Sequence, residues 1–293
     1  MKTWILDPAE LDRNSADKVG GKAAMLAELL RHDIPIPAFF VVSSETHGQF
    51  ASRYEGSTGD SASLPEELIT EIKDGMSRLF SYNADSTYYA VRSSGVGEDS
   101  TALSFAGQFE SYLGLRNLSE VIQAVKDCWA SARSERLAAY CRSRNVPVLS
   151  KFAVIIQEMI LADASGVIFT AHPLTGSTED MLIESNFGLG TSLVQGQATP
   201  DRFHITRSGL HVAEKQIGTK RKFATLNPDG GTHTIPTPAD QASRPSITDS
   251  QASDLAKLAV QIEAIAGVPQ DIEWAVYEGR PFILQSRPIT RGH

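Results

Sequence analysis

Polar and apolar residues alternate through two short runs near the end of the chain, on either side of Gly279. The apolar side chains there are Ile272, Trp274, Val276, Phe282 and Leu284. The polar side chains, all at odd positions, are Asp271, Glu273, Gln285 and Arg287. A period of two residues predicts two strands that form a hairpin with one apolar and one polar face. We expect a three-residue loop at 278–280, because a two-residue turn shifts the pairing by one and divides the apolar set between the faces.

The predicted register places Glu273 opposite Gln285 and Asp271 opposite Arg287, and the resulting polar face has two interpretations. It is either a solvated surface, on which an exposed Asp271–Arg287 pair contributes little to stability, or the wall of a cleft. In a cleft, the side-chain oxygens of Glu273 and Gln285 suit a hard cation such as Mg²⁺. Arg287 then reaches a phosphate that the same cation holds.

Helix and strand patterns are mixed along the rest of the chain. Apolar residues recur at helical spacing in 20–33, in 117–145 (one helix or two, with a cap at Ser119) and in 246–267, where Gly267 ends the helix. Short apolar runs predict strands within 38–43, 87–94, 152–160, 165–172 and 180–187. The span 220–246, rich in Pro, Gly, Ser and Thr, is the best candidate for a loop or lid. Because successive strands leave little room for helices, we predict an α+β fold with mostly antiparallel sheets in two lobes.

Composition narrows the class of protein. The 293 residues are 41% hydrophobic and 21% charged, as in a globular protein with a substantial core. A formal net charge of −8 argues against a nonspecific nucleic-acid binder. The two cysteines have no metal-site spacing, and the first residues reach an acid and a proline too early for a signal peptide. No apolar run is long enough to span a bilayer. We therefore expect a cytoplasmic protein without nucleic-acid or membrane partners.

Four stretches occur in an order that is typical of one family: "VGGKAAMLAEL" with "IPIPAFFVVS", "YAVRSSGVGEDSTALSFAGQFESYLGL", "SGVIFTAHPLTGSTEDMLIESNFGLGTSLVQGQATPDRF" and "DIEWAV" with "FILQSRPIT". Together they resemble the ATP-binding (ATP-grasp) domain shared by phosphoenolpyruvate synthase, pyruvate phosphate dikinase and rifampicin phosphotransferase. The resemblance runs from about Val19 to Thr290. It implies a two-lobed ATP-grasp fold, with an N-terminal lobe at 1–156 and a C-terminal lobe at 157–293.

The resemblance also implies a role for each candidate site residue, with ATP and Mg²⁺ as the ligands. The catalytic and phosphate-binding cations are Lys22, Arg92 and Arg287. The loop that covers the phosphates contains Gly107 and Gln108, in "SFAGQFESY", which departs from the glycine- and methionine-rich form of the dikinases. The adenine strand and the cleft beside it supply Gln157, Glu158, Met159, Ile160 and Glu184. The closing hairpin supplies Glu273 and Gln285 on the metal side, with Asp271 as a supporting acid.

Residue type alone leaves simpler roles open for several of these positions. Lys22 follows two glycines at a helix start, which favours an anion, although a lysine there is usually solvated. Arg92 leaves a strand, where a structural ion pair is equally reasonable. Glu184 either serves the ligand or pairs with a nearby base. His172 lies where the family often has asparagine, so we expect a structural histidine rather than a phosphorylated one.

The function implied by the resemblance is an ATP-dependent phosphotransferase. Larger members of the family charge a histidine on a swivelling domain, and nothing in this chain resembles that domain. The acceptor is therefore either a histidine in trans, on a separate phosphohistidine-domain protein, or a small molecule. The chain is an excised domain, a subunit of a split system or a complete small kinase. Two other classes remain: an ATP-grasp ligase that forms an acyl-phosphate, and a non-catalytic ATP-binding regulatory subunit.

Overall fold

The computed structural model describes residues 4–50, 64–79, 88–97, 110–132, 134–144, 146, 151–194, 196 and 198–289. The chain divides into two compact units, the first made of Met1–Glu28 with Ala38–Met159 and the second of Leu29–Pro37 with Ile160–His293. The segment Leu29–Pro37 groups with the second unit, in which the Ile283 amide donates a hydrogen bond to the Pro35 carbonyl at 2.8 Å.

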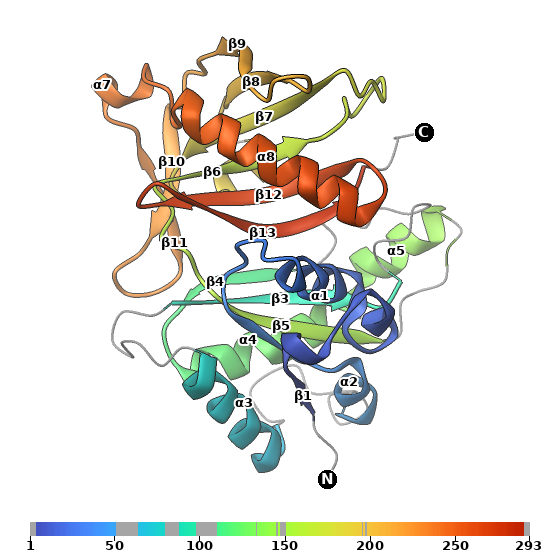
Figure 1. Ribbon diagram of the computed structural model, residues 1–293. Coiled ribbons are helices and arrows are strands. Elements are labelled where there is room, and N and C mark those ends of the chain that lie inside the picture. The colour runs from blue at the N-terminus through green and yellow to red at the C-terminus, as the bar shows by residue number, and fades with distance from the viewer. Residues whose placement is uncertain are drawn as a thin grey trace. The chain divides into compact units, whose positions relative to one another are not determined.

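The first unit is built on a five-stranded antiparallel sheet of order β1-β2-β5-β3-β4 (Figure 1). Its strands are β1 (Ile5–Leu6), β2 (Phe39–Val42), β3 (Tyr89–Gly95), β4 (Ser111–Leu115) and β5 (Phe152–Glu158). Its helices are α1 (Ala16–Arg31), which runs past the end of the unit, α2 (Ser44–Phe50), α3 (Glu66–Leu79), α4 (Leu118–Ser131) and α5 (Glu135–Arg144), besides the short 3-10 turns Pro8–Glu10 and Arg13–Ser15. Helices α3 and α4 pack against this sheet over a core that includes Val91, Trp129 and Ile156.

The long helical pattern of residues 117–145 forms two helices, α4 and α5, and its predicted cap at Ser119 is wrong. The cap is Asn117, whose side-chain oxygen accepts a hydrogen bond from the Glu120 amide at 3.0 Å. Asn117 also donates to the Glu120 carboxylate at 2.8 Å. Ser119 lies inside the first turn because asparagine two positions earlier has the extended backbone that a cap requires.

The second unit contains a six-stranded antiparallel sheet of order β13-β12-β6-β7-β8-β9 and a separate hairpin, β10–β11 (Figure 1). Its strands are β6 (Ala164–Phe169), β7 (Asp180–Phe187), β8 (Asp201–Thr206), β9 (Val212–Gln216), β10 (Lys222–Leu226), β11 (Thr232–Pro236), β12 (Gln270–Tyr277) and β13 (Arg280–Pro288). Its helices are α6 (Thr191–Val194), α7 (Ala239–Ala242) and α8 (Asp249–Ala266). Helix α8 crosses one face of the six-stranded sheet.

Helix α8 has clear sequence signals at both ends, and its prediction is confirmed. Thr248 and Gln251 form a capping box, in which the Thr248 hydroxyl accepts from the Gln251 amide at 3.2 Å and Gln251 accepts from the Thr248 amide at 2.8 Å. Gly267 ends the helix with a φ of 76°, in the left-handed region that glycine adopts without strain. The buried side of α8 carries Leu255 and Ile262, which cover the sheet.

The closing hairpin, β12–β13, keeps the predicted register at its open end but not at its turn. Asp271 pairs with Arg287 and Glu273 with Gln285, as expected. The three-residue loop is wrong: Tyr277 pairs with Arg280 across a two-residue turn, at which Glu278 and Gly279 have φ values of 49° and 75°. Positive φ at both positions is typical of the tight turns that match strand twist. An irregularity in the register between Glu273 and Trp274 absorbs the extra residue. Beyond it Phe282 pairs with Ala275 and Ile283 with Trp274, so the predicted apolar set is divided between the two faces.

The proline- and glycine-rich span 220–246 is not the loop that its composition predicts. It contains β10, β11 and α7, and the two strands pair from Lys222 with Pro236 to Leu226 with Thr232. The Leu189 amide donates to the Ala224 carbonyl at 2.8 Å, and so attaches the hairpin to the end of β7. The glycines and prolines therefore mark a turn and strand ends within ordered structure.

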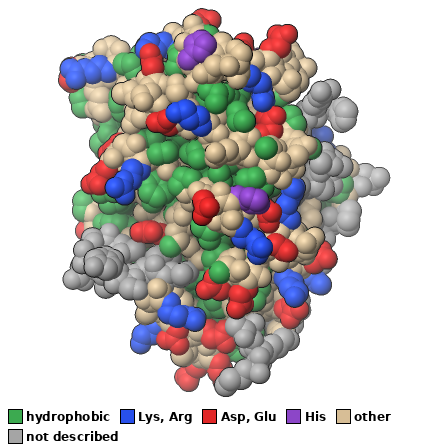
Figure 2. Space-filling model, viewed as in Figure 1, with side chains coloured by type: hydrophobic (Ala, Val, Ile, Leu, Met, Phe, Trp, Pro, Cys, Tyr) green, Lys and Arg blue, Asp and Glu red, His purple; other side chains and the backbone are tan. Residues whose placement is uncertain are grey.

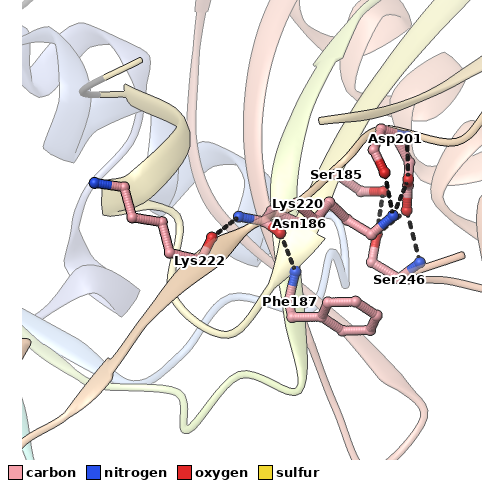
Figure 3. Close-up of polar contacts among 8 residues, drawn as sticks. Ser185, Asn186, Phe187, Asp201, Lys220, Lys222 and Ser246 are labelled. Carbon is pink, nitrogen blue, oxygen red and sulfur yellow. Dashed lines mark hydrogen bonds and ion pairs between the residues drawn. The ribbon is translucent and has the colours of Figure 1, made fainter. Parts of the chain in front are cut away.

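A buried polar network fixes the same region of the second unit (Figure 3). Lys220 and Asp201 form an ion pair, and neither side chain has any exposed surface. Asp201 also accepts from the Gly218 amide at 2.8 Å and from the amide and hydroxyl of Ser246, both at 2.7 Å. The Ser246 hydroxyl contacts that of Ser185 at 2.7 Å. The network thus joins β7, β8 and the segments that precede β10 and α8.

The predicted α+β class with antiparallel sheets is confirmed, since every pairing between the described strands is antiparallel. Within the described part of the chain, none of the helices combines the length and the apolar character needed to cross a bilayer. Acidic and basic side chains are interspersed on the face shown in Figure 2.

Candidate functional site

In the first unit, the glycine pair before Lys22 brings a helix start close to β3. Gly20 has a φ of 76° and interrupts the helical geometry of α1, so the regular helix begins just before Lys22. A Cβ atom on Gly20 would lie 2.3 Å from the Ser94 hydroxyl oxygen, which makes glycine necessary here. The Ser94 hydroxyl accepts from the Ala23 amide at 3.3 Å. Lys22 Nζ lies 3.5 Å from the carbonyl oxygen of Ser93, the residue after Arg92.

Arg92 and Gln157 lie on the same face of the five-stranded sheet. Arg92 pairs with Ile155, and Ala90 pairs with Gln157, so the two polar side chains point to the side on which Ser94 meets α1. Arg92 is half-buried in an otherwise buried strand. The structure thus brings Lys22, Arg92 and Gln157, which are far apart in the sequence, to one side of the sheet.

Gln157 has an unsatisfied donor at the end of β5. Its side chain is 1% exposed, and Nε2 has no hydrogen-bond acceptor among the described residues. A buried amide N–H without an acceptor destabilises a fold by about 1–3 kcal/mol, and such a group is expected where a ligand supplies the acceptor.

Beyond Gln157, backbone hydrogen bonds hold the predicted adenine strand in place. The Glu158 amide donates to the Ala38 carbonyl and the Met159 amide to the Tyr88 carbonyl, both at 2.8 Å. Burial raises the pKa of the Glu158 carboxyl, and a separate hydrogen bond from the Ala38 backbone to that carboxyl acts in the opposite direction. The Ile160 carbonyl accepts from the Ala162 amide at 2.9 Å. Gly107 and Gln108 lie outside the described residues.

In the second unit, cross-strand pairing collects polar side chains on the face of the six-stranded sheet opposite α8, which we call the polar face. Residues paired directly across antiparallel strands point to the same side. One row across six strands reads Gln285, Glu273, Val167, Glu184, Arg202 and Gln216. The next row begins with Arg287, Asp271 and Phe169. Ile272, Ile183 and Phe203 point the other way and are fully buried on the α8 side.

The Arg287–Asp271 pair on the polar face is only partly satisfied. Arg287 Nε and Nη2 both donate to Asp271 Oδ2, at 2.9 and 2.6 Å, while the side chains are 28% and 13% exposed. Asp271 Oδ1 is buried and has no donor among the described residues. Burial raises the pKa of the Asp271 carboxyl, the Arg287 charge lowers it, and the Glu273 charge raises it further, with a net upward shift. One oxygen of the Asp271 carboxylate can thus still accept a further interaction.

The side-chain oxygens of the polar face suit a Mg²⁺ ion that phosphates also coordinate. No group of three or more His, Cys, Asp or Glu side chains among the described residues could hold a metal by itself. Glu273 and Gln285 are directly paired, and Gln285 is 7% exposed. Mg²⁺ is commonly held by one or two carboxylates together with phosphates and water. One or two carboxylates and an amide therefore suit this ion when phosphates complete its coordination.

Glu184 has a partner that the sequence analysis did not identify. Arg202 Nε donates to Glu184 Oε1 at 2.8 Å, from the strand beside it. The alternation in "DRFHIT", with Phe203 and Ile205 buried and Arg202 and His204 on the other side, could have indicated a polar side chain on this face. His172 has a local structural role, because its Nδ1 accepts from the Leu174 and Thr175 amides at 3.2 Å each.

Comparison with known proteins places these features in one family. Residues 59–293 match the family "Pyruvate phosphate dikinase, AMP/ATP-binding domain". The prodigiosin synthesizing transferase PigC of Serratia marcescens is 38% identical over 93% of this chain and 32% of its own length. A probable phosphoenolpyruvate synthase of Archaeoglobus fulgidus is 36% identical over 98% of this chain and 41% of its own. The rifampicin phosphotransferase of Streptomyces sviceus is 33% identical over 98% and 36%. The chain thus spans less than half the length of these curated relatives.

Proposed function

We propose that this chain, which belongs to the AMP/ATP-binding domain family of pyruvate phosphate dikinase, binds Mg-ATP and transfers a phosphoryl group from it to an acceptor outside the domain. Membership confirms the family resemblance, the ATP-grasp fold and the assignment as the ATP-binding module of phosphotransferases. The metal, the acceptor and the roles of individual residues are the proposed part.

The observation that carries the proposal is the polar face of the second unit. Directly paired strands present Glu273 with Gln285 and Asp271 with Arg287, and Asp271 keeps one buried oxygen without a donor. A purely structural ion pair would satisfy both carboxylate oxygens, because each unsatisfied buried polar atom is costly. We assign Glu273 and Gln285 to Mg²⁺, with Asp271 as the supporting acid.

The cations of the chain have a complementary role. Lys22, Arg92 and Arg287 neutralise phosphate oxygens, and the helix start after Gly20 adds backbone N–H groups for an anion. Phosphoryl transfer needs little covalent chemistry from a protein, because positioning and charge stabilisation lower most of its barrier. Bound Mg²⁺ would supply further positive charge at the phosphates. Gln157 Nε2, buried without an acceptor, supports the assignment of β5 to the adenine.

The identity of the acceptor distinguishes a phosphotransferase from a ligase and from a regulatory subunit. An experiment with ATP labelled at the β- or γ-phosphate follows where the phosphoryl group goes. We expect label to move from ATP to a phosphohistidine-domain protein or to a small-molecule acceptor, in the presence of Mg²⁺. Transfer that requires both a carboxylate and an amine, and releases ADP, would instead indicate a ligase. Tight ATP binding without turnover, with every acceptor tried, would indicate a regulatory subunit.

A further inference from the structure

The Glu184–Arg202 pair lies in the same cross-strand row as the proposed magnesium residues. Glu273, Val167, Glu184 and Arg202 are directly paired from β12 to β8. Strands are about 4.8 Å apart, so Glu184 lies about 10 Å from Glu273 along the polar face. Only the half-buried side chain of Val167 separates the two carboxylates. The row therefore carries one carboxylate on each side of an apolar position.

The two carboxylates differ in how they are held. Glu184 is 22% exposed and accepts a charge-assisted hydrogen bond from Arg202, whose own side chain is 51% exposed. Such a bond restricts the rotamers of a glutamate. Since Nε of Arg202 reaches Oε1, the second oxygen of Glu184 keeps a defined direction.

We propose that Arg202 is a positioning residue of the nucleotide site, which acts by fixing the Glu184 carboxylate on the polar face. This inference rests on the proposed function, because it assumes that the polar face binds Mg-ATP. Arg202 does not take part in phosphoryl transfer. It orients a hydrogen-bond acceptor in the same cross-strand row as the proposed metal residues, and so contributes to the affinity for the nucleotide.

Arg202→Met tests this role, because methionine keeps the length of the side chain and removes the guanidinium. We expect the dissociation constant of Mg-ATP, measured by calorimetry, to rise about two- to fivefold, the range that a half-exposed ion pair supports. The turnover number should stay unchanged, so that the effect appears in KM. Arg202→Lys should recover part of the affinity, and thermal unfolding should shift little.

Lys215→Met is the matched control. Lys215 lies on the next strand, forms a comparable half-exposed pair with Asp249 at 2.8 Å, and points to the α8 side. It should leave Mg-ATP affinity unchanged. Adding Arg202→Met to Glu184→Gln should cause no further loss, because Arg202 acts through Glu184.

Two failures can be told apart. If the unmodified chain does not bind Mg-ATP, the proposed function is wrong. If it binds, and Arg202→Met binds as tightly as Lys215→Met does, the polar face still serves the nucleotide but the positioning role of Arg202 is wrong. Equal losses for the two variants would also overturn the role, because they would reflect a general effect of removing a positive charge.

Discussion

Two ion pairs in the second unit have similar chemistry and opposite degrees of satisfaction. Lys220–Asp201 has no exposed surface, and every oxygen of Asp201 accepts at least one hydrogen bond. Arg287–Asp271 is partly exposed, and Arg287 binds one oxygen of Asp271 while the other has no donor among the described residues. A saturated buried pair joins segments of a fold. An unsaturated pair on a sheet face has capacity for a ligand.

The two ion pairs also lie on opposite faces of the six-stranded sheet. Asp201 lies in the row that contains Ser185, Gly166 and Trp274, on the α8 side of the sheet. Asp271 lies on the polar face, beside Glu273. Lys220 also has a φ of 31°, which is unusual for a residue with a Cβ atom and persists only where the surroundings enforce it. The two carboxylates therefore differ in the number of their donors rather than in charge, and this difference supports a structural role for Asp201 and the proposed ligand-binding role for Asp271.

The largest effect is expected at the buried pair. Lys220→Met leaves Asp201 buried without its counter-ion, which destabilises a protein by about 3–5 kcal/mol. Urea unfolding measures this loss. The exposed pair Lys257–Asp254, within α8, is the control, and Lys257→Met should change stability by less than about 0.5 kcal/mol. Equal effects of the two variants would remove the distinction between the pairs.

The residues proposed for the nucleotide site should show the reverse behaviour, with a loss of activity and little loss of stability. Arg287→Ala and Glu273→Ala should each lower turnover by about 10²-fold or more, the loss seen when one preorganised charge-stabilising group is removed, while circular dichroism shows an intact fold. Glu214→Gln, on edge strand β9 of the same face, is the control and should retain activity. Full activity in Glu273→Ala would contradict its assignment as a metal residue.

Gln157 offers a smaller test on the first unit. Gln157→Met removes the buried N–H that lacks an acceptor, so the free energy of unfolding should stay constant or rise by up to about 1–2 kcal/mol. The affinity for ATP should fall, because the ligand loses that donor. A variant that loses stability and keeps its affinity would mean that Gln157 serves the core.

The smallest effect concerns the pH dependence of stability. The pKa of Asp271 is raised in the folded protein above its ordinary value of 3.8, mainly by burial. As pH rises from that value through the folded pKa, the unfolded chain releases the proton first, and the free energy of unfolding falls. Asp271→Asn should remove this fall, so the variant should gain stability relative to the original chain over that window. Urea unfolding between pH 3.5 and 7 measures the difference, and parallel curves would contradict the assigned shift.

The sequence predicted the parts of the fold that depend on local pattern. The strands in 152–160, 165–172 and 180–187 and the end of α8 at Gly267 follow from periodicity and caps. The pairs Asp271–Arg287 and Glu273–Gln285 follow from alternation within one hairpin. The two-residue turn at Glu278 and Gly279 was not predicted, because the alternation of apolar residues favoured a longer loop. The tighter turn is possible because the register shifts by one residue near Glu273, and nothing in the composition indicates that shift.

The features of the fold and of the candidate site that were not predicted depend on contacts between residues that are far apart in the sequence. The ordered hairpin β10–β11 resembles a loop in composition, and its attachment through Asn186 and Leu189 cannot be read from the span itself. Arg202 was missed because its importance comes from the pairing of β8 with β7, which only the sheet order reveals. The saturation of Asp201 likewise involves segments up to 45 residues away.

Calorimetry with Glu273→Gln is the decisive test of whether the polar face binds ATP through a magnesium ion. We expect Mg-ATP to bind the original chain and EDTA to abolish the binding heat. Glu273→Gln should weaken binding while it preserves the unfolding transition. ATP binding that is unchanged by both EDTA and Glu273→Gln would show that the polar face does not hold a magnesium-bound nucleotide.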